Sequence, residues 1–287
     1  MTQSHLHNPK STRQPPTSFF ALGYGELPER VQCAGKTYRH VKTFKHDFFA
    51  ATGLYQQIPA GQPPQELPAP NLNTGEGLAV LKLQRTFPLF GLPMQWLGAM
   101  VARHEIAIFQ KLQGIDGIPE FIGCIGPTGY MHAFVPGADL APEFEPDATF
   151  FAHLHELLAA IHNRHVAYVD TNKRENILFG ADGRPHLIDF QISFNCSKNE
   201  KSFWLKRRVL ARLQAEDWYH FYKHKTRLCP QACTPEDFAN ARRRSWYIRV
   251  HRFFAQPIIH TRRKFLRRYA PRPGIEPNPP GPPQANS

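Results

Sequence analysis

The stretch IHNRHVAYVDTNKRENILFGADGRPHLIDFQIS, residues 161–193, carries the motifs that decide the fold. Two apolar β-type runs flank a turn rich in Gly, Asp and Pro, which predicts a β-hairpin. We pair Phe179 with His186 across this turn. Antiparallel counting then places Asn176 opposite Asp189. An amide oxygen and a carboxylate at one end of an apolar hairpin suit Mg²⁺, which also takes phosphate oxygens. The alternative is a turn-capping Asn176 and an Asp189 that only ends a loop.

An acidic residue precedes this hairpin. Asp170 lies six residues before Asn176 and follows the short apolar run VAYV. An acid that emerges from a buried segment beside a metal ligand is a candidate base or hydroxyl-orienting group. Lys173 lies between the two and could reach a transferring phosphate. The alternative is a capping Asp and a solvated Lys.

Two opposite charges lie in apolar surroundings further upstream. The predicted strand LAVLKL, residues 78–83, is apolar except for Lys82, and an unpaired ammonium there costs several kcal/mol or loses its proton. On a helical wheel, Glu105 falls in the middle of the apolar stripe of VARHEIAIFQKL. Each charge therefore predicts the other as its partner. The alternative is a Lys82 that snorkels to water and a partly exposed Glu105.

The remaining pattern places strands first and helices later, which predicts the α+β class. Asp147 is the expected N-cap of a strong helix. The predicted strands lie in 37–58, 78–83 and 120–135, and the predicted helices lie at 95–113, in 148–165 and from 198 onward. A Pro/Gly-rich connection spans 59–77.

Composition limits the class of protein. The chain has 287 residues, of which 41% are hydrophobic and 12% aromatic, and this excludes a disordered chain. Five cysteines without a C-x-x-C pair favour a reducing compartment over a disulfide framework. No apolar run reaches the roughly 18 to 20 residues of a membrane span. We therefore expect a cytoplasmic protein.

The positive charge is concentrated near the C-terminus. Residues 198–270 contain 19 Lys and Arg against 5 Asp and Glu, a net +14, so the rest of the chain carries −2 of the total +12. This region interleaves basic and aromatic residues. It suits peripheral contact with an anionic membrane at its inner face. Nucleic acid is a less favoured partner, and the third interpretation is a helical lobe that only displays Arg to solvent.

Together these motifs resemble the protein-kinase-like superfamily over roughly residues 37–195. The stretch 161–193 is similar to that family's catalytic loop, hairpin and metal-binding motif. VLKL at 80–83 is similar to its V-A-I-K strand, and HEIAIFQKL at 104–112 to the helix that carries the paired Glu. YMHAFVPGADL at 130–140 is similar to the hinge that meets adenine.

The resemblance implies a two-lobed kinase-like fold that binds ATP and Mg²⁺. Lys82 would hold the α- and β-phosphates and pair with Glu105. His132 would lie at the gate of the nucleotide pocket. Ala133 to Val135 would offer the amide and the carbonyl that pair with adenine.

The resemblance also implies the catalytic roles. Asp170 would orient the acceptor hydroxyl, and Lys173 would offset charge on the transferring group. Asn176 and Asp189 would ligate magnesium. The protein would be an ATP-dependent phosphotransferase whose acceptor is a hydroxyl on a lipid-linked sugar, such as a lipopolysaccharide sugar, or on a protein.

The sequence departs from the family pattern around the catalytic loop. The H-R-D triplet reads Tyr168-Val169-Asp170, and the loop from Asp170 to Asn176 is one residue longer than in the family. The metal motif reads D-F-Q instead of D-F-G, and no A-P-E follows. These features resemble an atypical bacterial branch, similar to kinases of lipopolysaccharide core sugars (Kdo or heptose) and to RIO-type kinases.

The phosphate-covering turn differs as well. No G-x-G-x-x-G precedes the strand lysine, and the candidate turn is KTFKHDFFAATG at 42–53. Lys42, Lys45 and His46 would substitute charge for glycine flexibility. This absence motivates the chief alternative, a pseudokinase or basic binding module that contacts membrane or nucleic acid without catalysis.

The resemblance and the composition of the two ends together divide the chain into four parts. Residues 19–135 form the expected N-lobe and residues 136–270 the expected C-lobe. Residues 1–18 and the Pro-rich residues 271–287 are expected to be disordered tails. A histidine-rich metalloprotein is a remote alternative, based on the residues His153, His155, His162 and His165.

Overall fold

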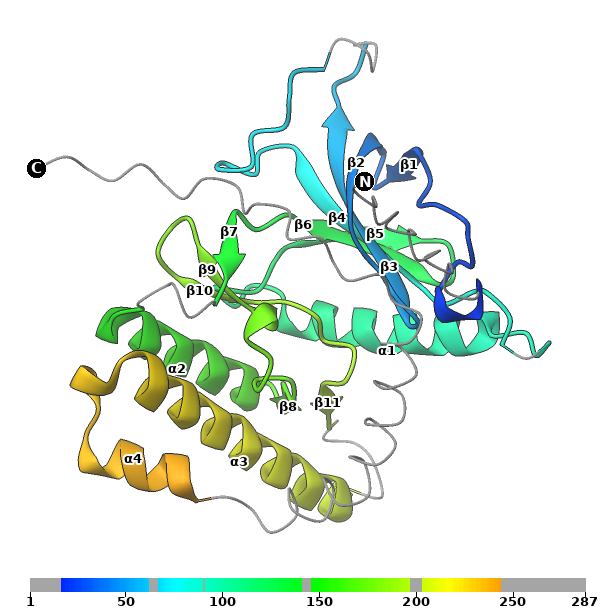
Figure 1. The fold of residues 1–287 in the computed structure, drawn as a ribbon. Coiled ribbons are helices and arrows are strands. Elements are labelled where there is room, and N and C mark those ends of the chain that lie inside the picture. The colour runs from blue at the N-terminus through cyan, green and yellow to red at the C-terminus, as the bar shows by residue number, and fades with distance from the viewer. Residues whose placement is uncertain (1–16, 62–66, 90, 141–145, 197–202, 244–287) are drawn as a thin grey trace, which may run out of the picture. The chain divides into compact units, whose positions relative to one another are not determined.

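Six antiparallel strands form the first sheet of the chain (Figure 1). Their order is β1-β2-β3-β4-β6-β5, with bounds Arg30–Cys33, Lys36–His46, Ala50–Ile58, Leu78–Gln84, Gly129–Ala133 and Phe121–Ile125. The computed structural model describes residues 17–61, 67–89, 91–140, 146–196 and 203–243. All of these belong to one unit of the chain, Thr17–Trp246. The predicted strands and the α+β class are thereby confirmed.

The sheet curls until its two edge strands meet. Register shifts between His40 and Lys42 and between Thr43 and Lys45 mark irregularities in β2, which increase the local twist. Strands β1 and β5 are in contact. At Gly123 a Cβ atom would lie 2.8 Å from the Cys33 sulfur, so a residue without a side chain lets the edges approach.

Helix α1, Gln95–Leu112, packs against β4 and β6. Its buried residues recur at helical spacing and include Ala102, Ile108 and Phe109. At Gly98 a Cβ atom would clash with the carbonyl oxygen of Arg85, which follows β4. Helix and strand are therefore in backbone contact at this point, and the helix matches its predicted bounds to within one residue.

A helix and several short strands come next along the chain (Figure 1). Helix α2, Ala148–Asn163, begins at the predicted cap, because the Asp147 carboxylate accepts a hydrogen bond from Phe150 N. The short strands form the sheets β10-β9-β7 and β11-β8. Strands β7, β8, β9, β10 and β11 have the bounds Gly137–Asp139, Val166–Ala167, Ile177–Gly180, Pro185–Leu187 and Phe194–Asn195, and the 3-10 helix η3 spans Arg174–Asn176.

The predicted hairpin is present, but its predicted register is wrong by one residue. His186 pairs with Leu178 and not with Phe179. The loop contains three residues, 181–183, because Gly180 N donates to Arg184 O at 2.8 Å. Gly183 has a φ of 76°, the left-handed conformation that such loops use. The residue across from Asn176 is therefore Ile188, whose N–H donates to Asn176 O at 3.2 Å.

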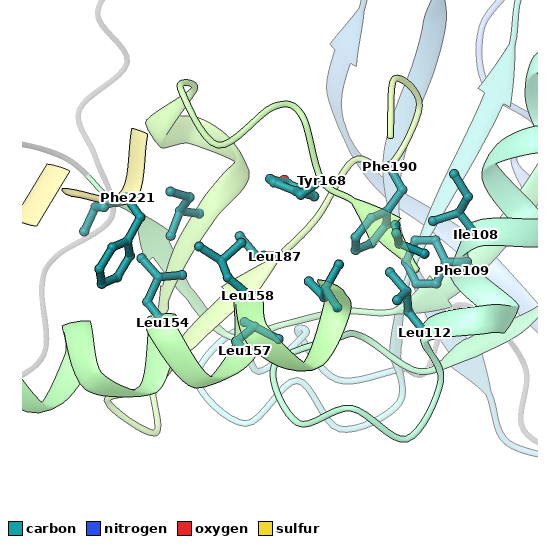
Figure 2. Close-up of a cluster of buried hydrophobic side chains, with 14 of the residues drawn as sticks. Ile108, Phe109, Leu112, Leu154, Leu157, Leu158, Tyr168, Leu187, Phe190 and Phe221 are labelled. Atoms are coloured by element: carbon teal, nitrogen blue, oxygen red, sulfur yellow. The ribbon is translucent and has the colours of Figure 1, made fainter. Parts of the chain in front are cut away.

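The largest hydrophobic core joins α1 to the later elements (Figure 2). Phe109 from α1 packs edge-on against Phe190, at 4.9 Å between ring centroids. Leu154 and Leu158 of α2 and Leu187 of the hairpin belong to the same cluster. A fully buried side chain of this size contributes about 1.5 to 3 kcal/mol. The residues around the hairpin are thus fixed from several sides.

Helix α3, Phe203–Leu228, and helix α4, Pro235–Arg242, pack against each other. The 3-10 helix η4, Pro230–Ala232, connects them. They confirm the predicted helices after residue 198. Within the described part of the chain, no helix is both long and apolar enough to cross a bilayer.

The predicted tails lie almost wholly outside the described residues. Thr17 and Ser18 are exceptions, because they begin the 3-10 helix η1, Thr17–Phe19. The end of the predicted C-lobe, from residue 244, also lies outside the described residues.

Candidate functional site

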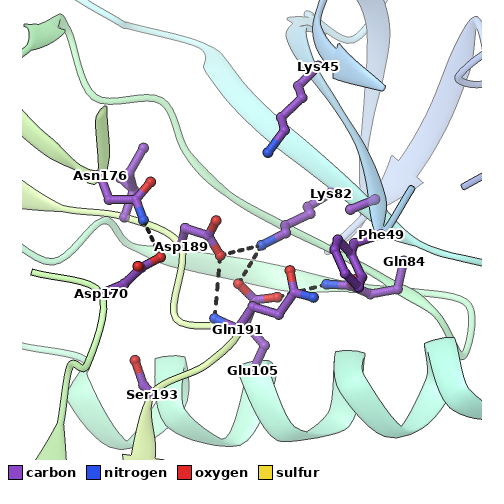
Figure 3. Close-up of polar contacts among 12 residues, drawn as sticks. Lys45, Phe49, Lys82, Gln84, Glu105, Asp170, Asn176, Asp189, Gln191 and Ser193 are labelled. Atoms are coloured by element: carbon purple, nitrogen blue, oxygen red, sulfur yellow. Dashed lines mark hydrogen bonds and ion pairs between the residues drawn. The ribbon is translucent and has the colours of Figure 1, made fainter. Parts of the chain in front are cut away.

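Two of the predicted carboxylates, those of Glu105 and Asp189, flank the buried ammonium group of the predicted Lys82 (Figure 3). Lys82 Nζ lies 2.7 Å from Glu105 Oε1 and 2.8 Å from Asp189 Oδ1. Only 9% of the Lys82 side chain is exposed, and the Glu105 side chain is fully buried. The predicted ion pair between strand and helix is therefore present, and the snorkelling Lys82 is excluded.

Two residues that sequence reasoning missed complete the surroundings of Glu105. Gln84 Nε2 donates to Glu105 Oε2 at 2.8 Å. Tyr130 also acts on this carboxylate and lowers its pKa. A period of two places Gln84 on the same strand face as Lys82, so alternation along β4 was a usable signal. Tyr130 faces Lys82 across β6, and only the sheet register reveals that.

The charges of this cluster support one another. Burial alone would lower the pKa of Lys82, but Glu105 and Asp189 more than offset burial and raise it. For Asp189, burial raises the pKa and Lys82 outweighs this, so the pKa lies below its ordinary value. Burial raises the pKa of Glu105, and Lys82 counteracts part of that rise. Lys82 stays charged and Asp189 stays an anionic acceptor at neutral pH.

The predicted catalytic residues form a second cluster beside the first (Figure 3). Asp170 Oδ2 accepts from Asn176 Nδ2 at 2.7 Å and from Lys173 Nζ at 2.6 Å. Burial raises the pKa of Asp170, although the bond from Lys173 lowers it. The Lys173 side chain is half exposed. An acid with a raised pKa, one cation and one amide is a suitable set for proton transfer.

Asp189 lies beside Lys82 although the hairpin register differs from the predicted one. The reason is the backbone conformation of Asp189 itself. Asp189 has a φ of 62°, an uncommon left-handed conformation for a residue with a side chain. The next residue, Phe190, is fully buried and packs on Phe109 and Tyr168. The Tyr168 hydroxyl donates to the carbonyls of Ile188 and Asn176. The loop before Asp170 and the end of the hairpin are thus directly connected.

A carboxylate on α3, which sequence reasoning missed, holds the loop before Asp170. Asp217 accepts hydrogen bonds from Tyr168 N, Val169 N and Thr171 Oγ1, each at 2.8 Å. Its helical spacing to the buried residues Leu210 and Phe221 was the available signal, the same one that identified Glu105.

The candidate phosphate-covering turn is the β2–β3 connection. Asp47 accepts from Phe49 N at 2.8 Å and from Ala50 N at 3.0 Å, which closes the turn. Lys45 lies 2.8 Å from Asp47 and points toward the Lys82 cluster (Figure 3). Lys42 is exposed.

His46 does not supply positive charge to this turn as predicted. Its Nε2 accepts the N–H of Leu22 at 3.1 Å, which requires an unprotonated nitrogen. Burial also lowers its pKa. The turn is held instead by Arg85, whose guanidinium donates to Phe48 O at 2.9 Å and lies 4.3 Å from the Phe48 ring centroid.

The backbone groups of the predicted hinge are only partly available to form hydrogen bonds with adenine. The Ala133 amide donates to Glu120 O at 2.8 Å, so among the groups that Ala133 to Val135 would offer to adenine this amide is already engaged. The reason is that β6 continues its pairing with the chain before β5. Among the described residues, no backbone hydrogen bond engages Val135, which keeps its amide and carbonyl for a ligand.

His132 is buried beside the hinge. Its Nδ1 lies 2.8 Å from Ala133 O, and its ring stacks on Phe109 at 5.4 Å between centroids. Burial lowers the pKa of His132 to about 4, so the ring is neutral. It lies on the same strand as Tyr130, close to the Lys82 cluster.

Asn176 and Asp189 have the chemistry that a magnesium ion requires. Because Asn176 donates through Nδ2, its side-chain oxygen remains an acceptor. Asp189 is anionic and bonds Lys82 through Oδ1, which leaves Oδ2 as an acceptor. Mg²⁺ takes one or two carboxylates and completes its shell with water and phosphate oxygens. The two residues fit such an ion.

The histidine-rich alternative has no support in the geometry. His162 Nε2 lies 3.0 Å from Asp217, whereas His155 packs on Trp218. In residues 17–243, apart from the undescribed segments, no group of three His, Cys, Asp or Glu could hold a metal.

No family model matches the chain, and no curated protein matches it.

Proposed function

We propose that this protein is an ATP-dependent phosphotransferase with a two-lobed, protein-kinase-like fold of an atypical branch. One observation carries the proposal: the Lys82 ammonium is buried between Glu105 and Asp189, residues 23 and 107 positions away in the sequence. Burial of this cation carries a desolvation penalty, which its two anionic partners offset. A triphosphate beside it would be a third anionic partner.

The second cluster supplies the groups for transfer. Asp170 would accept the proton of an acceptor hydroxyl, and its raised pKa suits a base near neutral pH. Lys173, already 2.6 Å from Asp170, would offset charge on the phosphoryl group. The exposed half of the Lys173 side chain gives it freedom to move between the two roles.

Asn176 and Asp189 would hold Mg²⁺ through their remaining oxygens. When bound, the ion would neutralise the phosphate oxygens. Lys82 keeps Asp189 ionised, since it lowers the pKa of that carboxyl against the effect of burial. Asp189 would therefore be an anionic ligand for the metal ion at neutral pH.

The adenine base would lie at the hinge. Val135 would provide the amide and carbonyl, in place of the engaged amide of Ala133. The neutral ring of His132 would close the inner end of this region. The acceptor would be a hydroxyl on a lipid-linked sugar, such as a lipopolysaccharide sugar, or on a protein.

The direct test is transfer of labelled γ-phosphate into separated lipid, polysaccharide and protein fractions. We expect label in one fraction, and we expect Asp170→Asn to reduce it by about 10² to 10⁴-fold because a general base is lost. Asp116→Asn is the matched control, since Asp116 is an exposed carboxylate that pairs with Arg184. Label that persists undiminished in Asp170→Asn would refute the role of Asp170.

The second candidate is a pseudokinase or basic binding module, favoured by the Phe48-Phe49 tip of the β2–β3 turn where the family has glycines. Mg-ATP at about 100 times its dissociation constant stabilises a protein by about 2.7 kcal/mol, which appears as a higher melting temperature. A shift without transfer favours a pseudokinase. The absence of any shift favours a module that does not bind nucleotide.

A further inference from the structure

The first half of α3 exposes apolar and cationic side chains on one surface. Its large apolar members are exposed by 67%, 54% and 40%, in the order Trp204, Leu205 and Val209. Its exposed cations are Arg207, Arg208 and Arg212. Residues 203–215 include no Asp or Glu. We call Trp204, Leu205, Arg207, Arg208, Val209 and Arg212 the α3 face.

This face is not needed to attach the helix to the rest of the fold. The opposite side of α3 is buried through Leu210 and Phe221 and is bonded to the catalytic loop through Asp217. A large exposed Trp and Leu therefore remain after the helix has been fixed in place. Exposed apolar side chains that gather on one surface mark an interaction site.

Charge determines what covers the α3 face. The C-terminal segment 247–270 contains seven Lys and Arg and no Asp or Glu, so like charges repel it. A second copy of the chain would bring the same cations against themselves. An anionic partner complements this charge.

We propose that the α3 face docks on the surface of an anionic phospholipid bilayer. Arg side chains would contact lipid phosphates, because a negative surface attracts cations. Trp204, Leu205 and Val209 would enter the interfacial layer, where Trp is favoured at the level of the headgroups. Nucleic acid would use the same cations, but its phosphate backbone offers nothing apolar to Leu205 and Val209.

Co-sedimentation of the full chain with vesicles tests this proposal without ATP, so its outcome is independent of the phosphotransferase proposal. We expect binding to vesicles of phosphatidylcholine mixed with phosphatidylglycerol, weaker binding in high salt, and none to phosphatidylcholine alone. Arg207→Gln with Arg208→Gln should lower the partition coefficient roughly 30-fold, about fivefold for each charge. Trp204→Gln should lower it about tenfold at unchanged charge.

Arg30→Gln with Lys36→Gln is the matched control, because it removes two exposed cations from β1 and β2. This control should leave binding within about twofold. Equal losses in the control and in the Arg207/Arg208 variant would overturn the α3 face, because only net charge would then matter. Unchanged binding in Trp204→Gln, or tighter binding to a DNA or RNA duplex than to anionic vesicles, would overturn the bilayer as its partner.

Discussion

Glu105 has one hydrogen-bond donor for each oxygen of its carboxylate. Lys82 occupies one oxygen and Gln84 the other. A buried carboxylate with all its partners is held in one rotamer, and loss of a donor leaves a desolvated acceptor. The ion pair between Lys82 and Glu105 is therefore already formed without a ligand, and α1 does not have to move to form it.

Replacing Gln84 tests this arrangement. Gln84→Leu removes the bond to Glu105 Oε2, and we expect the free energy of unfolding to fall by about 1 to 3 kcal/mol. If the phosphotransferase proposal holds, the KM for ATP rises more than kcat falls, because Lys82 is less well held. Gln84→Glu provides no donor when ionised and should not rescue.

Gln56→Leu is the control for this experiment. Gln56 is also buried on a neighbouring strand, and it bonds to Arg39 at 2.9 Å, away from the cluster. We expect a similar loss of stability with an unchanged KM. Equal KM effects in the two variants would show that Gln84 acts only through stability.

Single charged residues were the part of the site most accessible from sequence. Lys82 and Glu105 are conspicuous because each interrupts an apolar pattern, and the structure joins them. Gln84 shares a strand face with Lys82 by simple alternation, whereas the role of Tyr130 depends on the register of β4 against β6. That register is a long-range property which local patterns do not contain.

Among the elements, α3 controls the loop that contains the candidate base. Val169 has a φ of 70°, which a β-branched residue rarely adopts and which costs of order 1 to 3 kcal/mol. The two bonds from Tyr168 N and Val169 N to Asp217 offset this cost. The side chain of Asp170 is thereby directed by a helix that begins more than thirty residues later.

Asp217→Asn separates this contribution from that of the nucleotide site. An amide presents an NH₂ group to at least one backbone N–H, so we expect stability to fall by about 1 to 3 kcal/mol. The kcat for phosphate transfer should fall while the ATP-induced melting shift remains. Asp237→Asn in α4 is the control, because Asp237 is a buried carboxylate 2.9 Å from Lys225. An unaltered kcat in Asp217→Asn would contradict the positioning role.

The contact between α1 and the end of β4 gives a second prediction at this scale. Gly98→Ala raises helix propensity by about 1 kcal/mol, yet the new Cβ would clash with the Arg85 carbonyl. We expect net destabilisation, measured by denaturant unfolding. Met100→Ala on the exposed side of α1 should change stability by less than about 0.5 kcal/mol. A stabilised Gly98→Ala would disprove the close approach.

Elements were predicted more reliably than their pairing. The helices α1 and α2 and the cap at Asp147 follow from periodicity and capping, which are local. The hairpin register was wrong because one residue in the loop shifts every pair, and the observed loop has three residues, with Gly183 in the left-handed conformation. His46 was misjudged because its partner, Leu22, belongs to another segment, and the partner of the Ala133 amide, Glu120, is equally invisible to local patterns.

At the scale of the whole molecule, two buried histidines link stability to pH. Burial lowers the pKa of His132 and that of His224 to about 4, from an ordinary value of 6.5. The unfolded chain therefore binds more protons than the folded protein between these values, so stability rises with pH through this window. The contribution of these histidines to the free energy of unfolding is lost as pH falls below about 6.5.

We expect each histidine to reduce the free energy of unfolding by about 2 kcal/mol between pH 7 and pH 5. His224 Nε2 lies 2.8 Å from Thr171 O, and His224→Gln keeps a donor there without a titrating ring. Urea unfolding at both pH values should show a smaller loss in this variant than in the parent protein. An identical loss would exclude His224 as a source.

The meeting of β1 with β5 has a consequence for recognition. An open sheet offers unpaired backbone groups at both margins, and foreign peptides or other copies of a chain can extend it there. Here Cys33 and Gly123 close one margin upon the other. A polypeptide that adds a strand along β1 or β5 would first have to displace this contact, so the two margins are protected from strand addition where they meet.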